Sequence, residues 1–274
     1  MKKEIKNEQS FHKKKQIYFG ISKRERNINV QMNNESEYVI KYFGFDNLNK
    51  LIQIEKGDDD LNQLYFKYLS VNKTIPKNVL KIIIKHLLKG IEFITLKGII
   101  HGDIKMENVV IIMIKTCKII DFDLSQDIKV ANLHSIEELS NSFLYEDLYC
   151  VGKIMCLLLS TTQKKISICN GTSLLIPYGL DITKNCLELL IALLKENPNN
   201  RISITNAMKS PYIVSDDDSI VNFELIQERF ISKDKNGNNI LTIPLSKDVS
   251  MEKHSLSISN CVSVSLINDV YIIK

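Results

Sequence analysis

The sequence predicts an α+β protein in which a β-rich first part is followed by a mainly helical middle part and a β-rich tail. Two short runs rich in β-branched and aromatic residues, 37–45 and 49–55, indicate strands near the N-terminus. A long stretch, 76–96, carries apolar residues at helical spacing. The tail contains Asn236-Gly237 between two runs that favour strands, which is a hairpin signal. With 274 residues, of which 44% are hydrophobic, the chain can bury a sizeable core.

The first two runs are separated by turn-forming residues, Asp46, Asn47 and Asn49, so we expect two paired strands. The helix over 76–96 begins at a proline, which suits the first helical turn. Its apolar stripe is wide, so most of its circumference should be buried.

Two apolar runs after this helix each lead into a polar loop. They are IIHGDIKMENVVIIMI at 99–114 and KIIDFDLS at 118–125. Strands that end in polar loops are a common way for a scaffold to present reactive groups. Helical spacing returns at 145–160 and 186–195, and further strands are expected in 255–267.

Composition excludes several classes of protein. The 36 Lys and Arg against 32 Asp and Glu give a net charge of +4, spread along most of the chain, so we expect no nucleic-acid partner. The six cysteines contain no C-x-x-C pair, which argues against a zinc site or a disulfide framework and favours a reducing compartment. No run approaches the roughly 18 apolar residues of a membrane span. We therefore expect an intracellular protein, cytoplasmic or nuclear, without membrane contact.

The segment from His101 to Asn108 (HGDIKMEN), followed by Asp121-Phe122-Asp123, resembles the H-R-D-x-K-x-x-N and D-F-G motifs of protein kinases. Phosphoryl transfer needs a carboxylate for the hydroxyl proton, a cation near the γ-phosphate and oxygen ligands for magnesium. The resemblance assigns these roles in order to Asp103, Lys105, Asn108 and Asp121. The implied catalytic residues are Asp103, Lys105 and Asn108, with ATP as the nucleotide and Mg²⁺ held by Asn108 and Asp121.

An aspartate in a loop has a simpler interpretation, because Asp103 alone could be a residue that caps the loop. The spacing favours the functional interpretation. Asn108 follows Asp103 by five residues, and Asp121 follows Asn108 by thirteen, as in the protein kinases. Each motif also comes after an apolar run that would form a buried strand.

Two later segments extend the resemblance, which covers about residues 17–214. YEDLYCVGKIMCLLL resembles the kinase helix with D-x-W-S-x-G, and Asp147 and Gly152 match its Asp and Gly. In that family this aspartate holds the backbone of the catalytic loop. NPNNRISITNAMKSPYI resembles the closing kinase motif, in which Arg201 would pair with Glu137. These residues imply support for the fold, and they do not bear on activity.

The resemblance weakens toward the N-terminus. Ile54, Glu55 and Gly57 match the gatekeeper and hinge, whose backbone groups would bind adenine. Aligning IYFGIS with V-A-I-K places Ser22 on the ATP-binding lysine, so Lys23, one residue away, is the candidate for that role. The simpler interpretation of Lys23 is an exposed basic residue at the start of a helix.

Other N-terminal features of the kinases are missing. Asn27 falls where the glutamate of helix C belongs, with Glu25 two positions away, and no glycine precedes Gly20, so the G-x-G-x-x-G loop is absent. Lys41 in YVIK imitates V-A-I-K but lies too close to the catalytic loop, so we interpret it as a solvated strand residue. His86 on the apolar helix is interpreted as a satisfied core residue.

Two substitutions bear on regulation. Gly102 replaces the arginine that receives an activation-loop phosphate, so activation by phosphorylation is not expected. Asp123 replaces the glycine of D-F-G, which removes backbone freedom and adds a charge beside the metal site.

The sequence thus predicts a two-lobed, protein-kinase-like fold with a reduced β-rich N-lobe over 1–56, a mainly helical C-lobe over 57–214 and a β-rich appendage over 215–274. The leading hypothesis is ATP-dependent phosphoryl transfer to Ser or Thr of a protein substrate, because Lys105 is typical of Ser/Thr kinases within the family. A second hypothesis is a pseudokinase that regulates a protein partner. A third is a small-molecule kinase, since HGD with IDFD also resembles the aminoglycoside and choline kinases.

Overall fold

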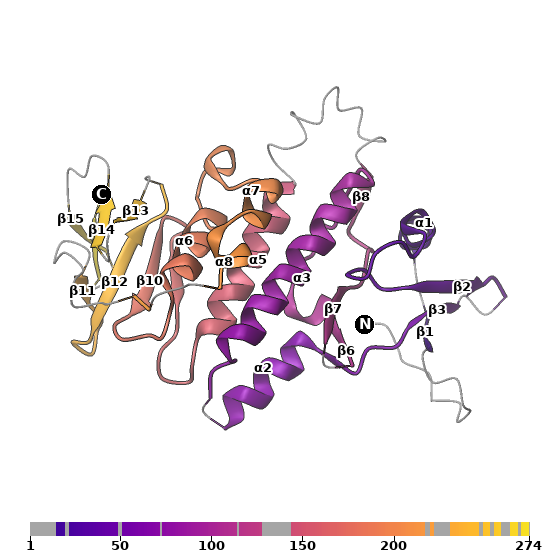
Figure 1. Ribbon diagram of the computed structural model, residues 1–274, viewed down its shortest axis with the longest axis horizontal. Coiled ribbons are helices and arrows are strands. Elements are labelled where there is room, and N and C mark those ends of the chain that lie inside the picture. The colour runs from indigo at the N-terminus through magenta and orange to yellow at the C-terminus, as the bar shows by residue number, and fades with distance from the viewer. Residues whose placement is uncertain are drawn as a thin grey trace. The chain divides into compact units, whose positions relative to one another are not determined.

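The structure is a computed structural model that describes residues 15–19, 22–48, 51–71, 73–113, 115–127, 144–216, 220–221, 231–246, 249–252, 255–258, 264–267 and 270–273. The chain divides into two compact units, Met1–Lys67 with Ile82–Val151 and Tyr68–Lys81 with Gly152–Lys274. It contains both helices and strands, which confirms the α+β class (Figure 1).

The first unit contains a three-stranded antiparallel sheet in the order β1-β3-β2. Its strands are β1 (Lys15–Phe19), β2 (Tyr42–Asp46) and β3 (Leu51–Glu55). The predicted pairing of two early strands is confirmed by β2 and β3. The earlier of the two begins at Tyr42 and not at residue 37, because Val39 forms a bridge with Ile119 instead.

Helix α1 (Lys23–Met32) begins with a capping signal that the sequence carries. The Ser22 hydroxyl accepts a hydrogen bond from the Glu25 N–H at 3.1 Å, and serine followed three residues later by glutamate is the capping-box pattern. Asn33 ends the helix in the left-handed conformation, with φ of 50°. The buried face of α1 carries Glu25, Ile28, Asn29 and Met32.

Helix α3 (Lys77–Leu96) confirms the longest helix that the sequence predicts. Its wide buried stripe consists of Leu80, Ile83, Ile84, Leu87, Leu88, Ile91 and Ile94. His86 was expected in the core but is only half-buried. Its ring packs 4.9 Å from the Tyr38 ring, and its Nδ1 accepts from the Cys117 N–H. At Gly90 an added Cβ would lie 2.7 Å from Ile119, so the glycine lets strand and helix approach closely.

Short strands of the first unit carry the loops of interest. A sheet in the order β4-β6-β7 is formed by β4 (Asp59–Asp60), β6 (Val109–Ile112) and β7 (Thr116–Ile119). A separate pair joins β5 (Ile99–Ile100) to β8 (Gln126–Asp127). Helix α2 (Leu61–Ser70) follows β4, and the 3₁₀-helix η1 (Met106–Asn108) precedes β6. The loop β5–β6 therefore contains residues 101–108, and the loop β7–β8 contains residues 120–125.

The second unit combines helices with a four-stranded sheet in the order β11-β12-β10-β9. The predicted helices are confirmed as α5 (Leu144–Leu159) and α6 (Lys184–Leu193), and they are followed by η3 (Pro198–Asn200), α7 (Ile204–Met208) and α8 (Pro211–Val214). The strands are β9 (Ser167–Cys169), β10 (Ser173–Pro177), β11 (Ile231–Lys233) and β12 (Asn239–Pro244).

The hairpin predicted at Asn236-Gly237 joins β11 to β12, and Gly237 supplies the positive φ of 80°. Further strands form two hairpins from β13 (Val249–Glu252), β14 (Ser255–Ile258), β15 (Val264–Ile267) and β16 (Val270–Ile273). Strand β12 pairs along its length with β10, so the tail and residues 173–177 share a sheet. The two domain boundaries predicted at 56 and 214 stay predictions.

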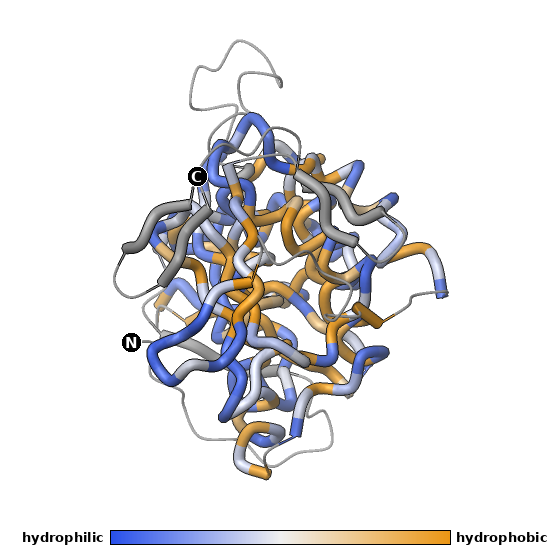
Figure 2. The backbone as a smooth tube through the Cα atoms, turned by 90° about the vertical axis from the view of Figure 1, so that its left-hand side faces the viewer, coloured by the Kyte–Doolittle hydropathy of each residue, from blue (hydrophilic) through white to orange (hydrophobic). Residues whose placement is uncertain are grey.

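Each unit buries aliphatic side chains, and Figure 2 shows the apolar stretches running through the interior while hydrophilic turns lie outside. Five described cysteines form no disulfide bond: Cys117, Cys150, Cys156, Cys169 and Cys186. Among the described helices, none combines the length and apolarity required to cross a membrane.

A substitution at Gly152 on α5 can test how tightly the side chains pack in the second unit. A Cβ at this position would lie 2.7 Å from the Leu194 side chain. Gly152→Val should therefore reduce the free energy of unfolding by about 1–3 kcal/mol through overpacking. Leu157→Val is the matched control, because this position of the same helix is 44% exposed and the change should be within about 0.5 kcal/mol. Urea unfolding measures both, and equal stabilities of the two variants would contradict the prediction.

Candidate active site

The imidazole of His101 joins the two loops of the first unit that carry the predicted site. It is completely buried, its Nε2 lies 3.0 Å from the Ile120 carbonyl oxygen, and its Nδ1 accepts from the Asp103 N–H at 3.2 Å. Its ring packs 5.0 Å from the Phe122 ring. Burial lowers the pKa of His101 to about 4, so the ring is neutral near pH 7. The two contacts define the tautomer, with the proton on Nε2.

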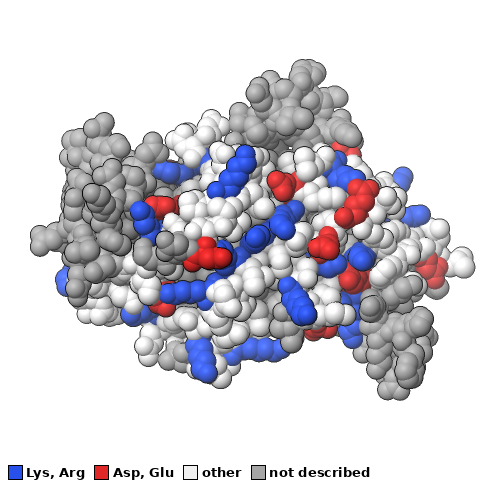
Figure 3. Space-filling view, viewed as in Figure 1, with Lys and Arg blue, Asp and Glu red and all other residues white. Residues whose placement is uncertain are grey.

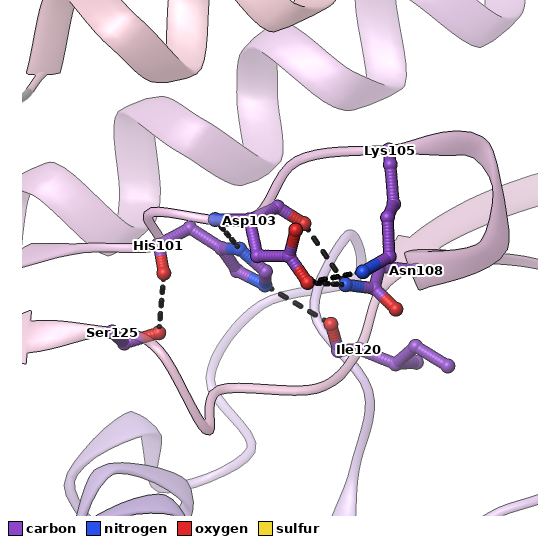
Figure 4. A network of polar contacts seen from close by, with 6 residues as sticks. All are labelled: His101, Asp103, Lys105, Asn108, Ile120 and Ser125. Atoms are coloured by element: carbon purple, nitrogen blue, oxygen red, sulfur yellow. Dashed lines mark hydrogen bonds and ion pairs between the residues drawn. The ribbon is translucent and has the colours of Figure 1, made fainter. Parts of the chain in front are cut away.

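Asp103, Lys105 and Asn108 lie together, as the spacing predicts (Figure 4). The Asp103 carboxylate accepts hydrogen bonds from the Lys105 ammonium and from the Asn108 amide, the latter at 2.9 Å. The same Asn108 amide donates to the Asp103 carbonyl oxygen at 2.9 Å. The hydrogen bond to Asp103 above all, and then the negative charges around it, raise the pKa of Lys105. Asp103 keeps 26% of its side chain exposed, so another molecule can reach its carboxylate.

Asn108 also connects the loop β5–β6 (residues 101–108) to the loop β7–β8 (residues 120–125). Its side chain is buried at the end of η1, and its carbonyl oxygen accepts from the Ile120 N–H at 3.0 Å. Because the amide nitrogen points toward Asp103, the side-chain oxygen lies on the side away from it (Figure 4). That orientation leaves an amide oxygen facing outward from the network, which suits a magnesium ligand.

Asp121 stands between Ile120 and the fully buried Phe122. Its φ is 68°, the left-handed region that a residue with a side chain rarely adopts. Strain of this kind persists where the surrounding structure imposes it, and it occurs often at functional sites. Backbone contacts of Ile120 and Phe122 thus hold the backbone of Asp121 just after β7.

The oxygens of Asn108 and Asp121 fit a magnesium ion. Mg²⁺ prefers oxygen ligands and binds few protein groups, because waters and phosphate oxygens complete its shell. Among the described residues, no group of three or more His, Cys, Asp or Glu side chains is placed to hold a metal. One carboxylate and one amide oxygen are ligand types that suit Mg²⁺ beside a nucleotide.

Asp147, on the first turn of α5, holds the backbone of the catalytic loop. Its two carboxylate oxygens accept from the N–H groups of His101 and Gly102, both at 2.9 Å. Gly102 has φ of 77°, and a Cβ there would lie 3.0 Å from the Leu124 carbonyl oxygen. Gly102 stands where the kinases have an arginine, and any side chain at this position would therefore be strained. The His101 backbone has a further partner, because the buried Ser125 hydroxyl donates to its carbonyl oxygen at 2.9 Å.

Of the predicted hinge residues, Ile54 and Glu55 end β3, and Gly57 follows it. Ile54 is buried in a cluster with Ile40 and Ile52, and Glu55 closes the strand. At Gly57 an added Cβ would lie 2.7 Å from Val110 of β6, so only glycine allows this approach. The backbone of this segment thus lies against β6, in the same unit as the catalytic loop.

Lys118 is a buried residue of this region that sequence reasoning missed. Its ammonium lies 2.8 Å from the Glu55 carboxylate, and its side chain is only 6% exposed. The segment KIID predicts an ordinary strand, and nothing in its sequence indicates that the lysine at its start is buried. Only the opposite charge of Glu55, far away in the sequence, could have suggested a pair.

The structure places the predicted residues of α1 on different faces. Lys23 is the first residue of the helix and is exposed, and within the described residues it is outside the network of Asp103, Lys105 and Asn108. Asn27, aligned with the helix-C glutamate, is exposed, whereas Glu25 is buried. Glu25 is therefore the carboxylate that α1 turns inward. Lys41 is exposed, as expected for a solvated residue.

Arg201 is buried in the second unit, where its guanidinium donates to the Lys195 carbonyl oxygen at 3.0 and 3.1 Å. Its predicted partner, Glu137, lies outside the described residues. Arg201 thus satisfies a carbonyl near the end of α6, which is a structural role.

An aspartate held by a lysine and an asparagine, beside a second aspartate at the end of the adjacent strand, is the arrangement of a phosphoryl-transfer site. The chain matches the protein kinase domain over residues 1–150, more than half of its length, and it belongs to that family. Members of the family generally use ATP and Mg²⁺. The matched residues include both motif loops and end within α5, so the Arg201 segment lies beyond them. A comparison with curated proteins found no match.

The buried Asp147 carboxyl makes the stability of the fold depend on pH. Burial is the main cause that raises its pKa from 3.8 to about 7, so between these values the folded chain holds a proton that the unfolded chain has released. The contribution to the free energy of unfolding is complete below about pH 4 and is lost as the pH rises through about 7, by at most about 1.4 kcal/mol per pH unit.

Urea unfolding across this pH range measures the effect. Asp147→Asn, which cannot ionise, should be less stable overall and should lack this part of the slope. If the difference in unfolding free energy between wild type and Asp147→Asn does not change with pH, Asp147 does not titrate in this range.

Proposed function

We propose that the protein transfers the γ-phosphoryl group of ATP to a serine or threonine hydroxyl of a protein substrate. The observation that carries this proposal is the Asp103 carboxylate, which is partly exposed and is held by both Lys105 and Asn108. A carboxylate in this setting can accept a hydrogen bond from an incoming hydroxyl and receive its proton. The family match and the family-like spacing of the motifs support the same reading.

Each residue of the network has a role in this proposal. Asp103 orients the hydroxyl and takes its proton late, and Lys105 places a positive charge beside the oxygens that gain negative charge during transfer. Asn108 and Asp121 would hold Mg²⁺, which neutralises phosphate charge. Asp147 is a positioning residue, because it acts on the backbone of the catalytic loop and not on the substrate.

The nucleotide would bind along the end of β3. Backbone groups of 54–57 are the proposed contacts of adenine, and Ile54 lies in the apolar cluster that would face the base. Lys23, the sequence-based candidate for the ATP-binding lysine, is the proposed phosphate contact. The Lys13–Lys15 run is another source of positive charge, and Lys13 and Lys14 lie outside the described residues.

A soluble protein substrate or partner inside the cell is part of the proposal. Among the described residues on the face shown in Figure 3, Lys and Arg side chains are interspersed with Asp and Glu and form no broad basic field of the kind that attracts nucleic acid. The match to the protein kinase domain supports a protein acceptor over a small molecule such as an aminoglycoside or choline.

A second candidate function is that of a pseudokinase that binds and regulates a protein partner. The specific observation in its favour is Lys23, which lies exposed at the start of α1. The sequence also lacks a glycine-rich loop ahead of Gly20. A protein with this arrangement would keep the kinase fold while it lacks a strong grip on the phosphates.

Two substitutions at the proposed centre test the first function. Asp103→Ala removes the group that orients the hydroxyl, so phosphate transfer should fall by about a hundredfold or more while ATP affinity is retained. Asp121→Asn removes the metal carboxylate, so Mg²⁺-dependent turnover should be lost while the melting temperature stays close to that of wild type. Transfer of ³²P to the protein itself or to a generic acceptor, and thermal shift with ATP, measure the two effects.

The matched control is Asp181→Asn, an exposed aspartate of the second unit that pairs with Lys77. It should transfer phosphate as wild type does. Turnover by Asp121→Asn equal to that of wild type would eliminate the metal assignment. A purified wild-type protein that transfers no phosphate with Mg²⁺ or Mn²⁺ would favour the pseudokinase.

Lys23→Ala tests the proposed phosphate contact. Loss of this ammonium should weaken ATP affinity and reduce transfer together, because it positions the phosphates before and during the reaction. Lys41→Ala is the matched control, since Lys41 is an exposed lysine of the same unit and should be neutral. If Lys23→Ala binds ATP as tightly as Lys41→Ala does, Lys23 is only an exposed residue of α1.

A further inference from the structure

A buried ion pair between Glu55 and Lys118 joins two strands. Glu55 ends β3 and belongs to the proposed hinge, and Lys118 lies on β7, the strand that precedes Asp121. The Lys118 ammonium lies 2.8 Å from the Glu55 carboxylate, with side chains 6% and 16% exposed. Among the ion pairs of the described residues, the other six keep at least 24% of each side chain exposed. Both side chains of the Glu55–Lys118 pair are therefore less exposed to water than any side chain of those six pairs.

The pair is part of a longer attachment of residues 55–58 to the β6–β7 hairpin. Lys118 stands opposite Val110 in the β6–β7 ladder, and Val110 is the residue that Gly57 approaches. The Asp58 N–H then donates to the Ile111 carbonyl oxygen at 2.8 Å. Side chain, close contact and backbone hydrogen bond thus fix the hinge segment at three successive points.

Lys118 is also close in sequence to Asp121, the proposed metal ligand. It precedes Asp121 by three residues. Between them, Ile120 donates its N–H to the Asn108 carbonyl oxygen, and its own carbonyl oxygen lies 3.0 Å from the His101 Nε2. On the other side, the Glu55 N–H donates to the Lys41 carbonyl oxygen at 2.8 Å. The pair therefore connects the segment proposed to bind the base with the segment proposed to bind the metal.

A buried ion pair contributes little net stability, because the loss of hydration offsets much of its attraction. Its stronger effect is on geometry. Charge attraction in a shielded place restricts the separation of the two strands, whereas apolar side chains of similar size allow them to slide. Replacement of both charges by apolar residues is for the same reason often neutral for stability.

We propose that Glu55 and Lys118 form a positioning pair, which holds the hinge segment at the distance from Asp121 that a nucleotide requires to reach both. The proposal rests on the proposed function, since it presupposes that the chain binds ATP. The pair acts through the backbone of 54–57, and neither charged group need touch the nucleotide.

The test uses the full-length double variant Glu55→Met/Lys118→Met, which leaves no buried charge unpaired. The matched control is Glu35→Gln/Lys97→Met, which removes a more exposed ion pair of 2.6 Å in the same unit. Calorimetric titration with ATP and Mg²⁺, and separately with adenosine, gives the Kd of each protein well below its melting temperature. Thermal melts without ligand give stability, and steady-state kinetics give KM and kcat.

We expect the double variant to fold with a melting temperature close to that of wild type and to bind both ligands about tenfold more weakly or worse. KM for ATP should rise by a similar factor while kcat at saturating ATP changes less, a split that a loss of stability alone would not produce. The control variant should bind as wild type does. If the double variant instead fails to fold, Lys118→Arg, which retains the charge, takes its place in a comparison with Lys118→Met.

Two negative results have different meanings. Wild-type protein that binds ATP, together with a folded variant whose Kd values are unchanged, overturns the positioning role and leaves the proposed function intact. Wild-type protein that binds neither ATP nor adenosine overturns the proposed function and this inference with it.

Discussion

The arrangement of the site depends on one buried and neutral side chain, the imidazole of His101. Its Nε2–H donates to the Ile120 carbonyl oxygen, and its Nδ1 accepts from the Asp103 N–H. A protonated ring has no acceptor and would break the second bond, so the low pKa that burial imposes is needed for the conformation of Asp103. Because the same ring packs on Phe122, the catalytic loop and the Asp121 loop are held as one piece.

The polar groups around His101 are buried at a cost that their hydrogen bonds offset. Asp147 accepts two backbone N–H groups, and the Ser125 hydroxyl donates to the His101 carbonyl oxygen. Loss of one partner leaves the other buried and unsatisfied, which costs more than the bond itself contributes. Such a network therefore specifies one loop geometry. Asp147 belongs to this network through the N–H groups of His101 and Gly102, so we expect its loss to change both the stability and the shape of the site.

Much of the fold could be predicted because its signals are local. The apolar spacing of 77–96 specifies a helix, the Asn236-Gly237 turn specifies a hairpin, and the distances between Asp103, Asn108 and Asp121 locate two loops. Other features had no local signal. The hairpin of β9 and β10 becomes part of a sheet only when β12 pairs with it, and the pairing of Val39 with Ile119 shortens the strand that residues 37–45 predicted.

The sequence by itself named the candidate residues for the proposed chemistry, because motif spacing can be measured without knowledge of the fold: Asp103, Lys105, Asn108 and Asp121 all follow from it. Only the tertiary structure decided which charges are buried. Glu25 faces inward while Asn27 does not, and Lys118 is enclosed with Glu55 although its neighbours in sequence give no warning. The reason is physical: the free energy of a charge depends on its distance from water and from a partner remote in sequence, and that distance exists only once the chain has folded.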